Sequence, residues 1–185
     1  MDITQLGISL HPEWLSTLFA YKSKTRAVFS DVLGLHEINH IAIAYIPRNQ
    51  TLISLSSSPA LEYNLFSSAL WRYDNCYNPN WIKQCKQAHW QSLYSPERYD
   101  ELYYIKQTKP RYPLGLAMAA ELELGHIIYT VATTTDNEYT QTLFNTQQHE
   151  LFQLGQYCSN QLLPILLDRQ LFPSNFLQTS DIGTL

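Results

Sequence analysis

The alternation of apolar and polar residues predicts two β-hairpins. The run I-A-I-A-Y-I, which begins at Ile41, alternates large with small side chains and ends at Pro47. The run T-L-I-S-L-S-S-S, which begins at Thr51, has the composition of a returning strand. Residues 112–123 and 127–134 are rich in apolar side chains and are separated by L-G-H. We therefore expect four strands that pair antiparallel in two hairpins.

Apolar residues at steps of three and four predict helices around these hairpins. Residues 12–35 carry this spacing, and shorter helices are expected after Pro59, Pro79 and Pro96, because proline is favoured in a first helical turn. The resulting order is helix, hairpin, helical middle, hairpin and long helix. This order indicates the α+β class, with helices packed on an antiparallel sheet.

A long closing helix is expected after Thr135. Thr135 and Glu138 have the spacing of a capping box, in which each side chain accepts a hydrogen bond from the other residue's backbone N–H. Pro164 is expected to bend or stop this helix, because proline has no N–H to donate. We therefore predict one domain over residues 1–167 and a C-terminal tail or linker over residues 168–185.

Composition narrows the classes of function. The chain has 185 residues, enough for one domain with a substantial core, and only 15% of them are charged. The net charge of −4 and the scattered basic residues argue against direct binding of nucleic acid by this chain. The sequence has no secretory leader pattern and no 18-residue apolar run, and its three cysteines form no disulfide framework. We therefore expect a cytoplasmic protein that does not contact a membrane.

The sequence H-E-I-N-H at residues 36–40 matches the H-E-x-x-H pattern of zinc peptidases. That chemistry needs both histidines one turn apart on a continuous helix, while the glutamate activates water. Here the motif follows Gly34 and continues directly into strand-like alternation. We therefore expect His36 and Glu37 at an exposed joint between helix and strand, His40 on a strand face, and no metal or other cofactor. A zinc hydrolase that uses these three residues is the alternative.

Aromatic side chains are unusually dense between residues 63 and 104. They are Tyr63, Phe66, Trp71, Tyr73, Tyr77, Trp81, Trp90, Tyr94, Tyr99, Tyr103 and Tyr104. The rings either form a core layer over the sheet or line an apolar pocket, in which indole N–H and phenol O–H groups orient a small ligand. Both interpretations stay open. Stacking on single-stranded nucleic acid is disfavoured, because few basic residues accompany the rings.

Several segments resemble the sensory domain of LuxR-type quorum-sensing regulators. The strand N-H-I-A-I-A-Y-I-P follows a first helical layer, as in that family, and Y-N-P-N-W-I-K-Q-C places Tyr77, Pro79 and Trp81 much as its Y-P-x-x-W-x-x-x-Y signature does. Cys85 stands where the second tyrosine usually lies, and Ser95–Pro96 falls near the usual Asp-Pro. The late run L-G-L-A-M-A-A-E-L-E-L-G-H-I-I-Y-T-V-A-T looks like the family's last hairpin.

The resemblance implies an α–β–α sandwich around an antiparallel sheet of about five strands, similar to PAS and GAF sensory domains. It implies a non-enzymatic regulatory role and a ligand pocket lined by Trp71, Tyr73, Tyr77, Trp81, Cys85, Trp90 and Ser95. In the family the tryptophan donates to a lactone carbonyl and the aspartate accepts from the ligand amide. Trp81 keeps the first role, whereas Ser95 is an uncharged acceptor and Cys85 lacks the phenol. We therefore expect a small apolar or amphipathic ligand other than an acyl-homoserine lactone, or none.

The resemblance also bears on partners. The family's C-terminal helix-turn-helix has no counterpart in the short segment after Pro164, so this chain is not expected to bind DNA by itself. A homodimer or a protein partner is expected instead, by analogy with the family. A remaining alternative is a protein adaptor that has a packed aromatic core, no ligand and an exposed apolar patch.

Overall fold

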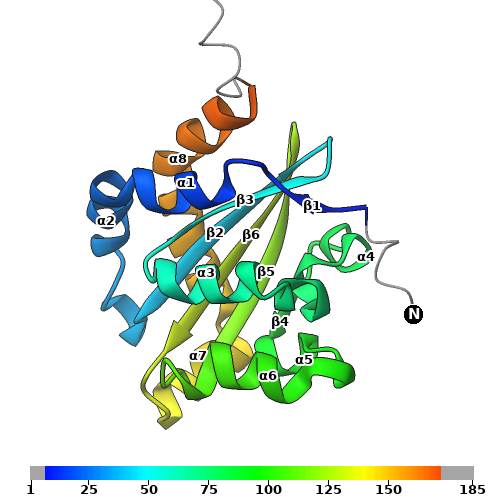
Figure 1. The fold of residues 1–185 in the computed structure, drawn as a ribbon. Helices are drawn as coiled ribbons and strands as arrows, with labels where there is room; N and C mark the ends of the chain where they lie inside the picture. The colour runs from blue at the N-terminus through cyan, green and yellow to red at the C-terminus, as the bar shows by residue number, and fades with distance from the viewer. Residues whose placement is uncertain (1–6, 172–185) are drawn as a thin grey trace, which may run out of the picture.

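The computed structural model describes residues 7–171 and shows an α+β fold built on one mixed sheet (Figure 1). The sheet has six strands in the order β1-β3-β2-β6-β5-β4. The strands are β1 (Ser9–Leu10), β2 (His40–Pro47), β3 (Thr51–Ser56), β4 (Gln87–His89), β5 (Leu114–Leu122) and β6 (Gly125–Thr133). The short β1 runs parallel to β3, and the other five strands pair antiparallel. The predicted fold class is therefore confirmed.

The two predicted hairpins are both present and meet in the middle of the sheet. β2 pairs with β3 and also with β6, where His40 lies opposite Ala132. β5 pairs with β6, where Gly115 also lies opposite Ala132. Because side chains that lie opposite one another point to the same face, His40, Ala132 and Gly115 form a row across three strands. Two members of this row are small, so a large side chain from another layer can lie over them.

The two faces of the sheet carry side chains of different size. The patterns I-A-I-A in β2 and L-A-M-A in β5 send alanine to one face and the larger residue to the other. We call the first the alanine face; it includes Ala44, Ala117, Ala119 and Ala132. The opposite face, which we call the large-residue face, includes Ile41, Ile43, Leu116, Met118 and Val131. Small side chains on the alanine face leave room for the aromatic rings of the middle segment.

Helices cover both faces, which gives the three layers seen in Figure 1. The large-residue face packs against α2 (Lys22–Ser30), α7 (Glu138–Thr146) and α8 (Gln148–Leu171). The alanine face packs against α3 (Pro59–Ser67), α4 (Pro79–Ile82), α5 (Trp90–Leu93) and α6 (Tyr99–Tyr103). Short turns join these helices, namely the 3₁₀-helices η3 (Leu70–Tyr73), η4 (Asn75–Tyr77) and η5 (Pro96–Arg98) and the π-helix η6 (Tyr104–Thr108). A further helix, α1 (Trp14–Ala20), packs on β3 and α3.

The first and last predicted helices each consist of two helices. Tyr21, with φ −98° and ψ 23°, separates α1 from α2, and Gln147, with φ −116° and ψ 40°, separates α7 from α8. The prediction of one continuous helix in each region was therefore wrong.

Pro164 does not stop the last helix. α8 continues to Leu171, because the residues around the proline, including Leu162 and Leu166, are fully buried on the large-residue face. Packing of these side chains outweighs the backbone hydrogen bond that proline removes. The helix therefore crosses the predicted domain boundary at residue 167, and residues 172–185 of the predicted tail lie outside the described residues.

The capping box of α7 lies two residues later than predicted. Asn137 is the N-terminal cap: its Oδ1 accepts from the Thr140 backbone N–H at 2.9 Å, and its own N–H donates to Thr140 Oγ1 at 3.0 Å. The predicted pair of Thr135 and Glu138 was wrong. The backbone N–H of Thr135 donates instead to Thr133 Oγ1 at 3.0 Å, as the chain leaves β6.

Candidate functional site

The H-E-I-N-H segment is a turn followed by a strand, as expected. His36 and Glu37 lie in η2 (Leu35–Glu37) with left-handed φ angles of 52° and 61°. His36 Nδ1 shares a hydrogen bond with the Tyr139 hydroxyl at 2.7 Å, whereas His40 begins β2 and is fully buried. The two histidines do not share a helical face, so this geometry gives the zinc-hydrolase alternative no support. Within residues 7–171 no group of three or more potential metal ligands is found.

Replacing Glu37 with glycine is expected to leave stability unchanged or to raise it by up to about 1 kcal/mol. The native left-handed φ strains a residue that has a Cβ but not glycine. On a continuous helix the same change would cost about 1 kcal/mol. Urea unfolding of the variant, beside Gln141→Gly within α7 as the helical control, measures the difference. A loss as large as that of the control would contradict the turn geometry.

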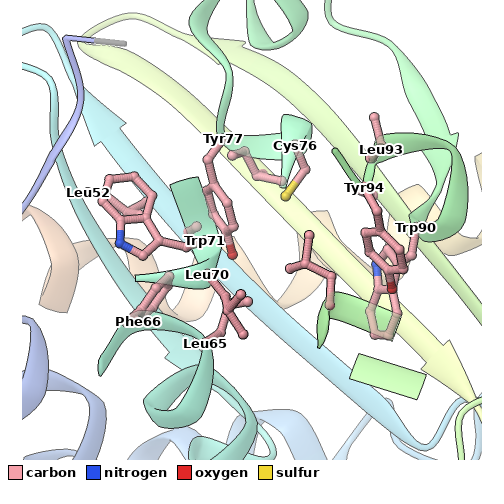
Figure 2. Close-up of a cluster of buried hydrophobic side chains, with 14 of the residues drawn as sticks. Leu52, Leu65, Phe66, Leu70, Trp71, Cys76, Tyr77, Trp90, Leu93 and Tyr94 are labelled. Carbon is pink, nitrogen blue, oxygen red and sulfur yellow. The ribbon is translucent and has the colours of Figure 1, made fainter. Parts of the chain in front are cut away.

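The structure brings most of the predicted pocket residues to the alanine face. Trp71, Tyr77 and Trp90 are buried there, and Tyr73 and Trp81 are half-buried and pack against the same cluster. Figure 2 shows the buried rings in two groups over the sheet, with Trp71 and Tyr77 in one and Trp90 in the other. The helical middle of the chain therefore forms one aromatic layer.

In the first group the rings pack directly on one another. The centroids of Trp71 and Tyr77 are 6.1 Å apart, and Phe66 lies 5.9 Å from Tyr77 and 6.4 Å from Trp71. All three pairs meet edge to face, an arrangement that aromatic quadrupoles favour. This part of the aromatic layer is a packed core, in line with one of the two interpretations of the sequence.

Cys85 and Ser95 lie at the margins of the aromatic layer. Cys85 is exposed, with a left-handed φ of 48°, so its thiol is at the protein surface. Ser95 is half-buried, and its backbone N–H donates to the Tyr73 carbonyl at 2.8 Å, which joins η5 to η3. We leave Cys85 out of the candidate site and keep Ser95 as a neighbour of it.

Four charged or titratable side chains, unforeseen from the sequence as a group, are buried close to the aromatic layer. His40, Glu62, Asp74 and Lys106 are each at most 3% exposed, and we call them the buried polar group. They come from β2, α3, the joint between η3 and η4, and η6. Charged residues are almost never buried unless they are paired, so this group needs a physical explanation.

Lys106 and Asp74 form a buried ion pair. Lys106 Nζ lies 2.5 Å from Asp74 Oδ2, 4.3 Å from the centroid of the Trp90 ring and 5.3 Å from that of Tyr94. Asp74 Oδ1 also accepts from the Cys76 backbone N–H at 3.2 Å, which begins η4. The ammonium group is thus held by one carboxylate and by two aromatic faces that attract cations.

The π-helical turn η6 explains why two consecutive polar residues point inward. Lys106 and Gln107 are both buried, and Gln107 Oε1 accepts from the Tyr94 hydroxyl at 3.1 Å while its Nε2 donates to the Pro113 carbonyl at 3.3 Å. A π-helical turn holds more residues than an α-helical turn, so consecutive residues are rotated by less than the 100° of an α-helix. Two neighbouring side chains can therefore point to the same side. Such turns occur often at functional sites.

His40 and Glu62 form a second pair, which is close to neutral. Their Nε2 and Oε1 atoms are 3.6 Å apart. Burial, together with the positive charge of Lys106, lowers the pKa of His40 to about 3. Burial raises the pKa of Glu62 to about 7, although hydrogen bonds, including one from Ser56, and the charge of Lys106 oppose the shift. Between about pH 3 and pH 7 the pair therefore holds one proton and carries no net charge.

The same region concentrates buried polar atoms that lack a partner. Among the described residues, five buried side-chain nitrogen or oxygen atoms make no hydrogen bond, and four of them belong to His40, Glu62 and Trp90. They are Nδ1 and Nε2 of His40, Oε2 of Glu62 and Nε1 of Trp90. Leaving such an atom unpaired costs about 1–3 kcal/mol, so a cluster of them indicates a place where a partner can bind.

Trp90 is positioned by the row of small residues across the sheet. A Cβ atom at Gly115 would lie 2.2 Å from the Trp90 ring, so the indole rests directly on the glycine backbone. The Trp90 centroid lies 6.0 Å from that of His40 and 6.5 Å from that of Tyr112, and the His40 and Tyr112 centroids are 5.5 Å apart. Gly115 thus brings the indole to the His40–Glu62 pair.

Replacing Gly115 with alanine is expected to destabilise the protein by at least about 1–3 kcal/mol, because the added methyl group overlaps the Trp90 ring. Urea unfolding followed by tryptophan fluorescence measures the loss. Combined with Trp90→Leu, which removes the ring, Gly115→Ala is expected to cost much less than it does alone. Additive losses in the double variant would contradict the contact.

Sequence reasoning missed Glu62, Asp74 and Lys106 as members of the site; it placed His40 on a strand face and named it otherwise only as a ligand of the alternative zinc site. One signal was present in the helical spacing. Glu62 lies three and four residues before the apolar Leu65 and Phe66, so it shares their buried helix face. The partners of these charges lie far away along the chain and could not be inferred from spacing.

A solved structure has a fold similar to that of this chain, whereas comparisons of sequence find no match. No protein-family model and no curated protein matches the chain. Among solved structures the chain is similar to Escherichia coli SdiA, a LuxR-type autoinducer-binding regulator, in its crystal structure in space group P6522. The TM-score is 0.52 at 12% sequence identity, over 93% of this chain and 71% of the SdiA chain. Within the described residues, no helix is both long and apolar enough to cross a bilayer. At this level of identity, the likeness shows that the chain shares the SdiA fold.

Proposed function

We propose that this chain is a regulatory domain without catalytic activity that binds a small molecule between its sheet and the helices on the alanine face. The fold likeness to SdiA supports this proposal. The observation that carries it is the cluster of unpartnered atoms on His40, Glu62 and Trp90. Buried polar atoms in folded proteins nearly always have a hydrogen-bond partner, so a ligand is a natural source of the missing one.

Aromatic rings beside His40 supply the apolar wall of the proposed site. The centroids of Trp90 and Tyr112 lie 6.0 Å and 5.5 Å from that of His40. A ligand bound there contacts β2, α3 and α5 together and stabilises their arrangement. It therefore raises the free energy of unfolding by mass action and shifts association with a partner. A homodimer or protein partner, the cytoplasmic location and the absence of DNA binding by this chain alone stay predictions.

Native mass spectrometry of the chain purified without denaturation tests this function. We expect a species heavier than the bare chain by the mass of one small molecule, which disappears after unfolding and refolding. The thermal midpoint is expected to fall when the molecule is removed and to recover when it is returned. A bare chain, with a thermal midpoint that extracts of small molecules from the expression host leave unchanged, would overturn the proposal.

A protein adaptor is the second candidate, because an apolar patch is exposed on α1 and α3. Leu15, Phe19 and Tyr63 are 43%, 44% and 42% exposed, and the Phe19 and Tyr63 rings lie 6.3 Å apart. Contiguous apolar surface of this kind is typical of protein contacts. This candidate predicts that Phe19→Ser abolishes partner binding while no small molecule changes the thermal midpoint.

A further inference from the structure

We propose that His40, Glu62 and Trp90 bind the polar head group of that small molecule, and that the head group is uncharged, with a hydrogen-bond acceptor beside a donor, as in an amide or a lactam. This inference rests on the ligand-binding function proposed above and deepens it. The three residues differ from the polar contacts suggested by the family resemblance, which were Trp81 and Ser95. They belong to the sheet, α3 and α5.

The positions of the three side chains allow one head group to meet all of them. His40 is close to both of the others: its Nε2 lies 3.6 Å from Glu62 Oε1, and its ring centroid lies 6.0 Å from that of Trp90. All three are at most 3% exposed, so water does not compete freely for their polar atoms. His40 and Trp90 are further fixed by the sheet, through the β2–β6 ladder and through Gly115.

The unpartnered atoms define the hydrogen bonds that the head group must make. The indole Nε1 of Trp90 can only donate. The neutral imidazole of His40 has one N–H donor and one acceptor nitrogen, and neither has a partner, while the unpartnered Oε2 of Glu62 is an acceptor. The site thus offers two N–H donors and one oxygen acceptor. A carbonyl oxygen takes bonds from the donors, and an adjacent N–H or O–H donates to Glu62.

Electrostatics disfavour a charged head group of either sign. His40 shows that the site disfavours a positive charge, because burial together with the charge of Lys106 lowers its pKa to about 3. Glu62 shows that the site also disfavours a negative charge, because burial raises its pKa to about 7. Lys106 is balanced by Asp74, so neither is free to compensate a ligand charge. Burying a further unpaired charge costs several kcal/mol.

Matched probes test the head group. Hexanamide, hexanoate and hexylammonium have the same apolar tail and differ in charge, and their effect on the thermal midpoint is measured at pH 6, where Glu62 is protonated. We expect hexanamide to raise the midpoint by about 4 °C at ten times its Kd, and the charged probes to have little effect. In Trp90→Phe and in Glu62→Met, the Kd of hexanamide is expected to rise at least about tenfold. Trp14→Phe, outside the site, is the matched control and keeps the wild-type Kd.

The outcomes separate this inference from the function on which it rests. A charged probe that binds more tightly than hexanamide, or a hexanamide Kd that is the same in both site variants as in the control, overturns the head-group assignment and leaves the ligand-binding function standing. If no probe binds but native mass spectrometry shows a retained molecule, a charged head group in that molecule overturns the assignment, and an amide-like one supports it. No probe binding and a bare chain overturn both.

Discussion

Replacing Lys106 with methionine is expected to destabilise the protein by about 3–5 kcal/mol, because it leaves the Asp74 carboxylate buried without its cation. The change also removes the contact of the ammonium group with the Trp90 ring, 4.3 Å from its centroid. Urea unfolding measures the loss. Lys109→Met, one turn later at an exposed position, is the control and is expected to change stability by less than about 0.5 kcal/mol.

The double variant Lys106→Met with Asp74→Asn shows whether the loss comes from the unpaired charge. Asparagine keeps an oxygen for the Cys76 backbone N–H and removes the negative charge. We expect the double variant to recover most of the stability lost in Lys106→Met. If Lys106→Met alone is as mild as Lys109→Met, the buried ion pair does not have the role assigned to it.

Replacing Glu62 with glutamine is expected to change how stability depends on pH. The folded-state pKa of Glu62, about 7, is raised above the ordinary value of 4.5, so its protonated form is favoured by folding. Its contribution is fully present below pH 4.5 and is lost as the pH rises through 7. Glutamine does not titrate, so the variant is expected to gain roughly 3 kcal/mol relative to the wild type between pH 4.5 and 8.

The titration of His40 makes the free energy of unfolding rise with pH, which is opposite to the effect of Glu62, and it does so in both the wild type and Glu62→Gln. Its folded-state pKa of about 3 is lowered from 6.5, so its contribution is present above pH 6.5 and is lost as the pH falls towards 3. In the wild type the slopes of His40 and Glu62 cancel between pH 4.5 and 6.5 and leave a plateau, whereas Glu62→Gln keeps rising across this range. Urea unfolding at a series of pH values measures both profiles. Glu123→Gln, at an exposed position, is the control, and a Glu62→Gln profile parallel to it would contradict the assignment.

The fold could be predicted well where local pattern determines it. The alternation of apolar and polar residues in the runs that begin at Ile41 and Thr51 predicted the first hairpin, and Pro59 predicted the start of α3. Both signals depend only on residues that are close together in the sequence. The breaks at Tyr21 and Gln147 were missed, since no glycine or proline marks them. At these two positions the packing of the helices on the sheet interrupts a helix that the spacing of apolar residues predicted to be continuous.

The candidate site could be predicted only in part, because its chemistry depends on long-range contacts. The aromatic density drew attention to Trp71, Tyr77 and Trp90, which do share one layer. The closeness of His40 to Glu62 depends on how α3 lies against the sheet, and no local pattern encodes it. Lys106 is one of the scattered basic residues of the chain, and no local pattern indicates that the turn η6 buries it.

The most direct test of the central claim is the indole N–H resonance of Trp90 in a ¹H–¹⁵N spectrum. The chain has four tryptophans, so Trp90→Phe identifies its peak by elimination. On titration with hexanamide we predict that the Trp90 peak moves downfield and saturates, because an unpartnered N–H gains an acceptor, while the Trp14 peak stays in place. A Trp90 peak that does not move at saturating hexanamide, or a Trp14 peak that moves more, would contradict the account.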